Sequence, residues 1–197
     1  MLAKVTAKKL NTVRINAGEW RSRLIKFPDA EGLRPTPERV RQTVFNWLGQ
    51  DLTGLHCLDL FAGTGVMGFE ALSRGAVSAT LVEKYLPAYQ ALISNKQLLQ
   101  ANNAEILHQD ALQFLKQNTL KFNLIFLDPP YNQAWLPKIL PIIANHLHAK
   151  GLVYVEAEYA LDQAELNENI GLMQHWKIIK QSKAGHVFYH LLQVKKE

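Results

Sequence analysis

The four residues Asp128, Pro129, Pro130 and Tyr131 carry the clearest chemical pattern in the chain. They follow the run Phe122 to Leu127, which has the length and nearly continuous apolar character of a buried strand. The two prolines end that strand and leave backbone carbonyls without neighbouring N–H donors. A carboxylate, a free carbonyl and an aromatic ring can hold a planar group that bears an amine, because the first two accept its N–H bonds and the ring stacks on its face. The alternative is a proline loop with a capping acid and a packing tyrosine.

A second pattern follows an earlier strand, where Gly63, Gly65 and Gly68 have the spacing G-x-G-x-x-G between a strand and a helix. Glu83 comes twenty residues after Gly63, at the end of the next strand, where an acid can hold ribose hydroxyls. Asp59 lies four residues before the first glycine, where it would repel a pyrophosphate and attract a cation. The pattern predicts a nucleotide-like ligand. NAD is one candidate, and S-adenosylmethionine, which has a sulfonium, an ammonium and no phosphate, fits the acid better.

Acids stand at the ends of four consecutive predicted strands, namely Asp59, Glu83, Asp110 and Asp128. Because the carboxyl ends of parallel strands meet at one edge of a sheet, where ligands bind, we expect these side chains to share one rim. Asp110 has a second interpretation, because an acid also favours the start of a helix.

Strands and helices alternate from Leu55 onward, and this alternation predicts a parallel, doubly wound sheet with right-handed crossovers. The last two strands are joined through Ala184-Gly185, so they should pair in antiparallel fashion at one edge. The expected fold is therefore a Rossmann-like α/β domain with a mostly parallel seven-stranded sheet and an antiparallel C-terminal hairpin. The expected strands are 55–60, 78–83, 105–108, 122–128, 151–157, 176–180 and 187–194, and the expected helices are 66–74, 86–101, 110–117 and 135–148.

Positive charge is concentrated at the N-terminus. Residues 1–41 hold ten lysines and arginines against four acids, whereas residues 42–197 hold twelve against thirteen, for a net charge of +5. This distribution predicts a polyanionic partner for the first segment, and a solvated basic tail is the alternative.

The basic segment is expected to form a small hairpin and the start of a helix. Short strands at 13–16 and 24–27 flank a turn whose tip carries Trp20, Arg21 and Arg23, a combination that suits nucleic acid unless the tryptophan packs beneath the hairpin. Thr36 should cap a helix that begins at Pro37 and runs to about residue 48. The arginines at its start do not suit the helix dipole, so we interpret them as ligand-binding.

Composition sets broad limits. With 48% hydrophobic and 20% charged residues, the 197-residue chain has the composition of a globular protein. It has no apolar run of about 20 residues and no signal-peptide pattern, so we expect a cytoplasmic protein away from membranes. Its one cysteine, Cys57, lies in an apolar strand, and the seven histidines have no metal-ligand spacing. We therefore expect no metal, and nothing suggests an obligate dimer, so we expect a monomer.

The motifs Asp59-Leu-Phe-Ala-Gly-Thr-Gly65, Glu83, Asp110 and Asp128-Pro-Pro-Tyr131 resemble those of class I S-adenosylmethionine-dependent methyltransferases that act on amines. With Arg34-Pro-Thr-Pro-Glu-Arg-Val-Arg41, Phe45-Asn-Trp-Leu48 and the basic hairpin, nearly the whole chain resembles the RsmD family of bacterial 16S rRNA guanine-N2 methyltransferases. Pro37 departs from the threonine often found there, which affects only the local helix start.

The resemblance implies a cofactor site for S-adenosylmethionine. In it, the backbone of the turn that contains Ala62, Gly63 and Gly65 would lie against the methionine part of the cofactor, with Asp59 near its ammonium. Glu83 would bind the ribose. At the adenine, Asp110 would meet the amine and Ala111 would offer its backbone N–H.

The resemblance also implies a catalytic group and an RNA surface. Asp128 and the Pro129 carbonyl would accept hydrogen bonds from guanine N2, Pro130 would stiffen the loop and Tyr131 would stack on the flipped base. The implied substrate is 16S rRNA or the small ribosomal subunit. The candidate RNA-binding residues are Arg14, Trp20, Arg21, Arg23, Arg34, Arg39 and Arg41.

The expected division of the chain is a basic RNA-binding extension over 1–41 and a methyltransferase domain over 42–197. Other functions stay open at this point. They are a DNA adenine-N6 or cytosine-N4 methyltransferase, a protein-glutamine methyltransferase, a non-catalytic RNA-binding module and an NAD-dependent oxidoreductase.

Overall fold

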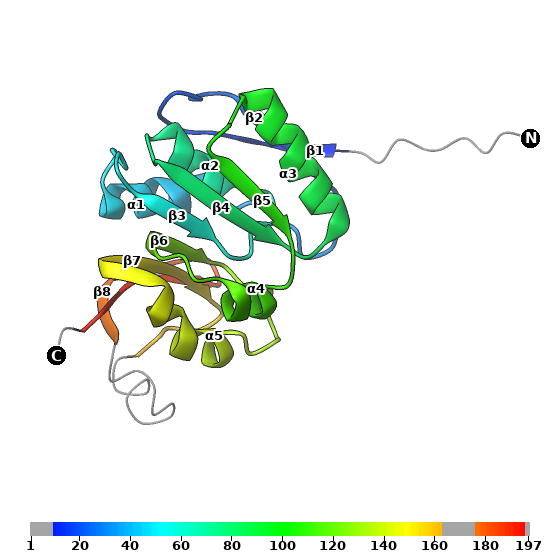
Figure 1. Cartoon of the computed structure of the whole chain (residues 1–197). Coiled ribbons are helices and arrows are strands. Elements are labelled where there is room, and N and C mark those ends of the chain that lie inside the picture. The colour runs from blue at the N-terminus through cyan, green and yellow to red at the C-terminus, as the bar shows by residue number, and fades with distance from the viewer. Residues whose placement is uncertain (1–9, 163–175, 196–197) are drawn as a thin grey trace, which may run out of the picture.

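The computed structural model describes residues 10–162 and 176–195, which form a seven-stranded sheet and a separate two-stranded sheet (Figure 1). The strand order of the larger sheet is β5-β4-β3-β6-β7-β9-β8. Its strands are β3 (His56–Asp59), β4 (Ser78–Glu83), β5 (Ala104–His108), β6 (Phe122–Leu127), β7 (Leu147–Ala157), β8 (Trp176–Ala184) and β9 (Val187–Val194). The helices are α1 (Glu38–Leu48), α2 (Val66–Ser73), α3 (Leu86–Leu99), α4 (Ala111–Gln117), α5 (Leu136–Ile143) and the 3-10 helix η1 (Ala144–His146).

Strands β3 to β7 run parallel, and each crossover between successive strands contains a helix. The burial of β6 explains these helical crossovers: every residue except Asn123 is buried, so the strand needs helices on both faces. The alternation of strands and helices and the α/β class expected from the sequence are confirmed.

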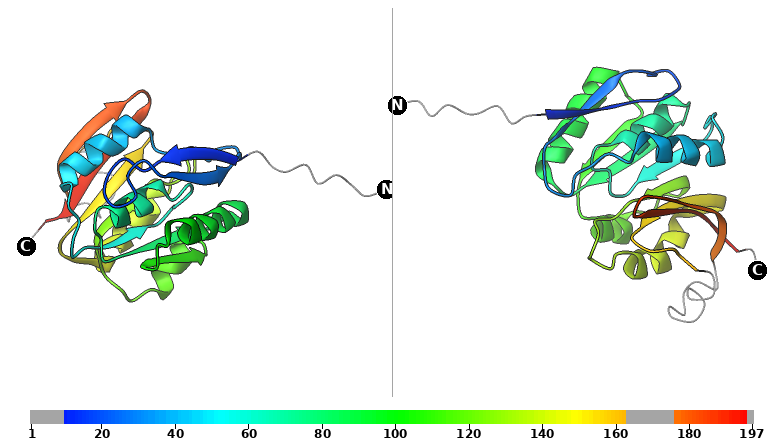
Figure 2. Two further views of the ribbon diagram at one scale, coloured as in Figure 1. Left: turned by 90° about the horizontal axis from the view of Figure 1, so that it is seen from above. Right: turned by 180° about the vertical axis from the view of Figure 1, so that it is seen from behind.

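Alternate side chains of the central strands enter two hydrophobic cores, one on each face of the sheet. Leu124 and Phe126 join the core made with α1, α2 and α3, whereas Ile125 and Leu127 join the core made with α4 and α5. Figures 1 and 2 show the helices on both sides of the sheet. The period of two along each strand therefore decides which helices each side chain meets.

The N-terminal strands β1 (Leu10–Arg14) and β2 (Leu24–Pro28) form a hairpin as predicted, with Arg14 opposite Leu24. The expected bounds of the first strand, 13–16, are wrong, because pairing with β2 begins at Leu10 and ends at Arg14. Its buried side chains, among them Ile15 and Ile25, belong to the same core as α1, α2 and α3. Asn95 of α3 also exchanges two hydrogen bonds with the Lys26 backbone, at 2.9 and 2.7 Å. The hairpin is thus packed onto the sheet domain, and the expected division after residue 41 falls inside α1.

Glu70 of α2 joins this N-terminal segment to the sheet domain. Its side chain is fully buried and forms ion pairs with Arg41 at 3.3 Å and Arg74 at 2.7 Å. It also accepts the backbone N–H groups of Asn16 and Ala17, at 2.8 and 3.1 Å. One carboxylate therefore fixes both the helix α1 and the loop that follows β1.

The C-terminal strands close the sheet as expected, because β9 lies between β7 and β8 and is antiparallel to both. β8 extends past the expected end at Lys180 to Ala184, which pairs with Val187 beside the turn. Among the described residues, no helix has both the length and the apolar character that a membrane crossing requires.

The predicted helix that differs most from the structure is the last one, and the predicted start of α1 is also wrong. The helix expected over 135–148 ends at Ile143, and after η1 the chain enters β7 at Leu147, which pairs with Phe122. Tertiary pairing with β6 thus overrides the local helical pattern. At α1, Pro37 rather than Thr36 is the N-cap residue and no side chain caps the helix.

Candidate active site

The turn between β3 and α2 brings backbone, rather than side chains, to the end of the sheet. Gly63 and Gly65 have positive φ angles of 51° and 77°. A Cβ atom on Gly65 would lie 2.3 Å from Leu92 of α3, so this position requires glycine. Ala62 closes the turn: its carbonyl accepts the Gly65 N–H at 2.6 Å, and its own N–H donates to the Val82 carbonyl at 2.9 Å. The Ala62 N–H is therefore used inside the protein.

The register of the strands brings the predicted acids to one edge of the sheet. Cys57 and Phe126 both enter the core beneath α1, α2 and α3. Asp59 and Asp128 each follow one of them by two residues, so the two acids lie on that same face of the sheet. Because Asp59 pairs with Phe126 in the register of β3 and β6, Asp128 stands just beyond Asp59. Glu83 stands in the same relation on the other side of Asp59, on β4.

Glu83 ties the glycine turn to the end of β4. One of its oxygens accepts the Gly63 N–H at 2.7 Å and the other accepts the Tyr85 N–H at 2.6 Å. Burial raises the pKa of Glu83, although these N–H groups act in the opposite direction. A carboxylate has about four lone-pair positions, so each oxygen can still accept a hydroxyl donor such as a ribose.

Asp110 caps α4, which is the second interpretation that the sequence allowed. Its Oδ1 accepts the N–H groups of Leu112 and Gln113 at 3.0 and 3.3 Å, and its Oδ2 lies 3.1 Å from Lys84 Nζ. Burial raises the pKa of Asp110, but the hydrogen bond and charge of Lys84 and the two amides outweigh it and leave the pKa lowered. Ala111 is the first residue of the capped helix.

The surroundings of Asp59 and Asp128 raise the pKa of both carboxyl groups. Asp59 is 4% exposed and accepts the Gly68 N–H at 3.0 Å. Burial raises its pKa to about 7, and the charge of Glu83 adds to the rise. Burial also raises the pKa of Asp128 well above its usual range, with further contributions from the charges of Glu156 and Asp59. Both groups hold a proton more readily than an ordinary carboxyl.

Glu156 is a site residue that the sequence interpretation missed. It lies at the end of β7, is 3% exposed and accepts the Tyr154 hydroxyl at 2.8 Å. Burial raises its pKa, while hydrogen bonds from the hydroxyls of Tyr154 and Thr36 act to lower it. The signal was present, because Glu156 is an acid at the end of a predicted strand in the same way as the four acids that were recognised.

These acids suit a cationic ligand. Among the described residues, no Lys, Arg or His nitrogen lies within 4.0 Å of a carboxylate oxygen of Asp59, Asp128 or Glu156. The described part of the chain also contains no group of three or more His, Cys, Asp and Glu side chains arranged to hold a metal ion. Burying negative charge without a partner is unfavourable, so a positive ligand would be stabilised here. The sulfonium and ammonium of S-adenosylmethionine supply that charge, and the bare backbone at Gly63 and Gly65 lets a ligand approach.

The loop after Asp128 combines a rigid start with an exposed ring. Pro129 is buried, whereas Tyr131 is 41% exposed. Asn132 and Ala134 follow with positive φ angles of 61° and 47°, which are uncommon for these residues. The Asn132 N–H donates to Glu158 Oε1 at 2.8 Å, so the loop is tied to the chain that follows β7. The exposed Tyr131 ring is free of the core, as a stacking residue must be.

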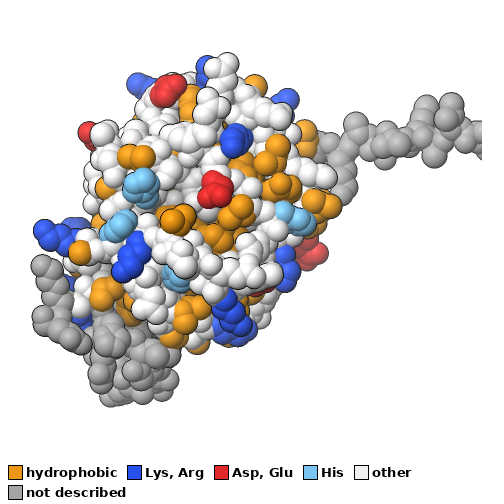
Figure 3. All heavy atoms as spheres, viewed as in Figure 1, with side chains coloured by type: hydrophobic (Ala, Val, Ile, Leu, Met, Phe, Trp, Pro, Cys, Tyr) orange, Lys and Arg blue, Asp and Glu red, His pale blue; other side chains and the backbone are white. Residues whose placement is uncertain are grey.

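Five of the candidate RNA-binding residues are exposed, and they are Arg14, Arg21, Arg23, Arg34 and Arg39. One of the Arg14 N–H groups donates to the Ser22 carbonyl at 3.0 Å, which leaves other donors of the same guanidinium for a phosphate. On the face shown in Figure 3, lysine and arginine side chains are dispersed among apolar ones and form no continuous stripe.

The expectation for Trp20 is wrong, because the side chain is only 5% exposed and belongs to the main core. The hairpin tip folds onto the end of α2, where the Trp20 N–H donates to Ser73 Oγ at 2.9 Å and the Glu19 N–H donates to the Ser73 carbonyl at 2.7 Å. Trp20 therefore packs beneath the hairpin and presents no stacking surface.

The expectation for Arg41 is also wrong. The residue is 2% exposed, and its guanidinium pairs with Glu70 at 3.3 Å and donates to the carbonyls of Thr36 and Arg14, at 3.1 and 2.8 Å. Arg41 lies next to Val40 on the buried face of α1. Its unusual place at a helix start is explained by this internal network and not by a ligand.

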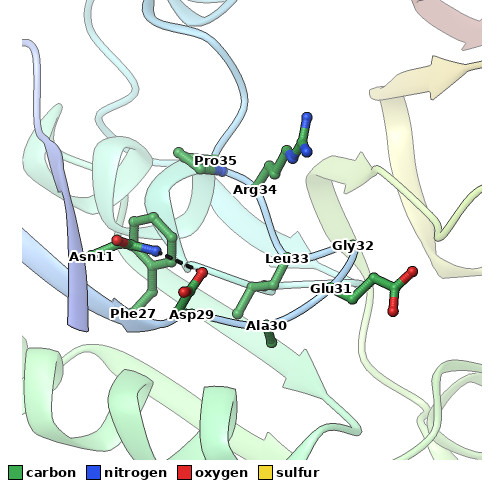
Figure 4. Close-up of a pocket in the computed structure, with 9 residues that line it drawn as sticks. All are labelled: Asn11, Phe27, Asp29, Ala30, Glu31, Gly32, Leu33, Arg34 and Pro35. Atoms are coloured by element: carbon green, nitrogen blue, oxygen red, sulfur yellow. Dashed lines mark hydrogen bonds between the residues drawn. The ribbon is translucent and has the colours of Figure 1, made fainter. Parts of the chain in front are cut away.

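A hollow of about 470 Å³ lies between the hairpin and the loop that leads to α1 (Figure 4). Its lining includes Asn11, whose side chain donates to Asp29 at 3.3 Å, and Arg34, whose guanidinium extends away from the other lining residues. None of the acids at the strand ends lines it. Leu33 lines this hollow and also lies beside the glycine turn, because one of its methyl groups would be 3.1 Å from a Cβ atom placed on Gly63.

Comparisons with known proteins agree with this geometry. The family model described as Conserved hypothetical protein 95 matches residues 13–193. Ribosomal RNA small subunit methyltransferase D of Escherichia coli strain K12 is 39% identical over 183 residues, which cover 92% of this chain and 89% of that protein. The Haemophilus influenzae protein of the same name is 38% identical over 187 residues, which cover 92% of this chain and 93% of that protein.

Solved structures show the same fold. A candidate methyltransferase from Escherichia coli has a TM-score of 0.81 and 36% identity, over 95% of this chain and 100% of that chain. The 16S rRNA N2 G1207 methyltransferase of Thermus thermophilus, solved with S-adenosylmethionine and guanosine, has a TM-score of 0.72 at 18% identity, over 98% of this chain and 52% of that chain, a likeness of fold alone. The chain therefore belongs to the RsmD family, that of the ribosomal RNA small subunit methyltransferases D, and is an S-adenosylmethionine-dependent methyltransferase.

Proposed function

We propose that this protein transfers a methyl group from S-adenosylmethionine to the exocyclic N2 amine of a guanine in 16S rRNA, within the small ribosomal subunit or its assembly intermediate. The names and coverage of the relatives support ribosomal RNA of the small subunit as the substrate. The observation that carries the proposal is the placement of Asp128 at the carboxyl end of β6, just beyond Asp59 in the register and shortly before the exposed Tyr131 in the chain.

The cofactor, when bound, supplies a methyl group on a sulfonium. The part of this chain is to hold the amine, whose lone pair is delocalised into the ring and is therefore a weak nucleophile. Asp128 and the Pro129 carbonyl accept the two N2–H bonds and draw the nitrogen toward a tetrahedral geometry. These hydrogen bonds strengthen as positive charge develops on the nitrogen, so they stabilise the transition state more than the ground state.

The N2 nitrogen gains one methyl group and must lose one proton. Asp128 is the acceptor already hydrogen-bonded to it in this arrangement. Because burial and the neighbouring charge of Glu156 raise the pKa of Asp128, its carboxylate is a better proton acceptor than an ordinary aspartate.

The base must leave its stack to reach this edge, and stacking on the exposed Tyr131 ring offsets part of the unstacking energy. The exposed arginines of the hairpin and of α1 hold RNA phosphates, which accounts for the excess of positive charge in the first 41 residues.

The test is a transfer assay with methyl-labelled S-adenosylmethionine and small ribosomal subunits from cells that lack the activity, with naked 16S rRNA and DNA in parallel. We expect the label in N2-methylguanosine. Asp128→Asn should lower the rate at least about 100-fold, because the amide oxygen is a weaker hydrogen-bond acceptor than the carboxylate and cannot take up the proton. Glu105→Gln, on the exposed edge strand β5, should keep the wild-type rate. Label in DNA as N6-methyladenine would contradict the proposal.

A further inference from the structure

In the methyl transfer described above, Glu156 acts only through its charge, which raises the pKa of its neighbour Asp128. Leu127 of β6 pairs with Val155 of β7, so the next residues of the two strands, Asp128 and Glu156, stand side by side. The residues two positions earlier, Phe126 and Tyr154, enter the same core, so both carboxyl groups lie on one face of the sheet.

The surroundings of Glu156 hold the carboxyl group in place without neutralising it. The Tyr154 hydroxyl donates to Oε1 at 2.8 Å, and the Thr36 hydroxyl donates a second hydrogen bond. Thr36 is itself fixed, because Arg41 donates to its carbonyl at 3.1 Å. Two neutral donors leave about two acceptor positions of the carboxylate unused. The Glu156 carboxyl group is 3% exposed and has no cationic partner within residues 10–162 and 176–195, which is unfavourable for stability and points to a ligand that donates to it.

The bases that carry an exocyclic amine differ in the atom next to it. Guanine has a donor, N1–H, beside its N2 amine, whereas adenine and cytosine have a ring nitrogen with a lone pair beside theirs. Asp128 and the Pro129 carbonyl accept from the amine of any of these bases. A second carboxylate beside Asp128 accepts from guanine N1–H and repels the lone pair of the other two.

We propose that Glu156 is the specificity-determining residue that accepts the N1–H of the target guanine, an inference that rests on the proposed guanine-N2 function. The ends of β6 and β7 then offer three acceptors, from Asp128, Pro129 and Glu156, to the three donors on that edge of guanine. Adenine and cytosine leave the Glu156 carboxylate facing a lone pair, and a buried mismatch of this kind gives strong discrimination.

The test uses small subunits reconstituted with 16S rRNA that carries either guanine or 2-aminopurine at the modified position. 2-Aminopurine keeps the N2 amine and has a lone pair at N1. The wild-type protein should prefer guanine by about 1,000-fold or more in kcat/KM. Glu156→Gln can donate its amide N–H to N1, so it should narrow this ratio at least 10-fold. The loss of the guanine O6 is common to both proteins and cancels in the comparison.

Glu156→Asp keeps the charge but moves the carboxylate away from the base, so it should also narrow the ratio of kcat/KM for guanine over 2-aminopurine. This variant provides the test if Glu156→Gln fails to fold. Glu105→Gln on β5 is the matched control and should keep the wild-type ratio. Equal use of the two bases by the wild-type protein, or a ratio that the Glu156 variants leave unchanged, overturns the role of Glu156. A failure of the proposed function is seen separately, as the absence of N2-methylguanosine from guanine-containing subunits treated with wild-type protein.

Discussion

Gly65 combines two requirements at one residue. Its φ angle of 77° lies in the left-handed region, and the space beside its Cα is filled by Leu92 of α3. The turn that leads into α2 is therefore defined by backbone conformation and by packing from a second helix, and both bring bare backbone to the edge where Asp59 and Glu83 stand.

Gly65→Ala should lower the free energy of unfolding by about 2–4 kcal/mol, since it adds an overpacked Cβ to an unfavourable φ angle. It should also weaken S-adenosylmethionine binding. Gly54→Ala is the matched control, because Gly54 has a φ angle of 85° and open space where a Cβ would stand, so only about 1 kcal/mol should be lost. Urea denaturation and a cofactor titration measure both effects. Equal losses in the two variants would contradict the packing argument.

Three segments meet at Glu70: the loop after β1, the helix α1 through Arg41, and α2 itself through Arg74. All three charged side chains are buried, so their charges depend on each other. Removing residues 1–41 to test RNA binding would also remove Arg41 and the N–H groups of Asn16 and Ala17, which are three partners of the buried Glu70. Single substitutions of exposed arginines are therefore the better test.

Glu70→Gln should lower the free energy of unfolding by about 3–5 kcal/mol, because removing one partner of a buried ion pair leaves uncompensated charge on Arg41 and Arg74. Urea denaturation measures the loss, and hydrogen exchange at the Ala17 amide should show whether the loop after β1 loosens. Glu105→Gln is the exposed control and should change stability by less than about 0.5 kcal/mol. A loss below about 1 kcal/mol for Glu70→Gln would show that the network contributes little.

The acidic edge makes the stability of the whole protein depend on pH. Asp59 has a usual pKa of 3.8 and a folded pKa of about 7, so between these values the folded protein holds a proton that the unfolded chain has released. Its contribution to stability therefore falls as pH rises through that window. His190 acts in the opposite sense, because burial lowers its pKa to about 4 and stability is lost as pH falls from its usual pKa of 6.5.

A comparison of Asp59→Asn with the wild-type protein isolates the acid from the histidine. In the absence of cofactor, the variant should be the more stable protein, and its advantage should grow as pH rises from about 4 to about 7 and then level off. Thermal unfolding at a series of pH values measures the difference. A constant difference across the series would mean that Asp59 keeps an ordinary pKa in the fold.

The exposed arginines predict a salt-dependent interaction. Replacing Arg34 and Arg39 by alanine should weaken RNA binding and flatten the plot of log affinity against log salt by about 0.7–0.9 for each phosphate contact removed. The control is Lys116→Ala. Lys116 is exposed on α4, which packs on the opposite face of the sheet from the hairpin, so this change should leave the slope unchanged. Binding titrations at several salt concentrations decide between the outcomes, and an unchanged slope in the arginine variant would move the RNA surface elsewhere.

Local sequence patterns were enough to predict the fold class, the glycine turn and the edge at which the acids stand. These features follow from local properties: the period and length of apolar runs define strands such as β6, and parallel strands bring their carboxyl ends to one edge. The resemblance carried by the motifs, extending over nearly the whole chain, is confirmed by the match over residues 13–193.

Packing between distant segments determines which side chains face water and which acids are neighbours. Arg41 pairs with Glu70, 29 residues later in the chain, and Trp20 packs against the end of α2, so neither burial could be inferred from nearby residues. Glu156 stands beside Asp128 because β6 and β7 pair in one particular register, and a shift by one residue would turn its side chain to the other face. Local patterns specify elements, whereas burial and electrostatic partners depend on how distant elements pack.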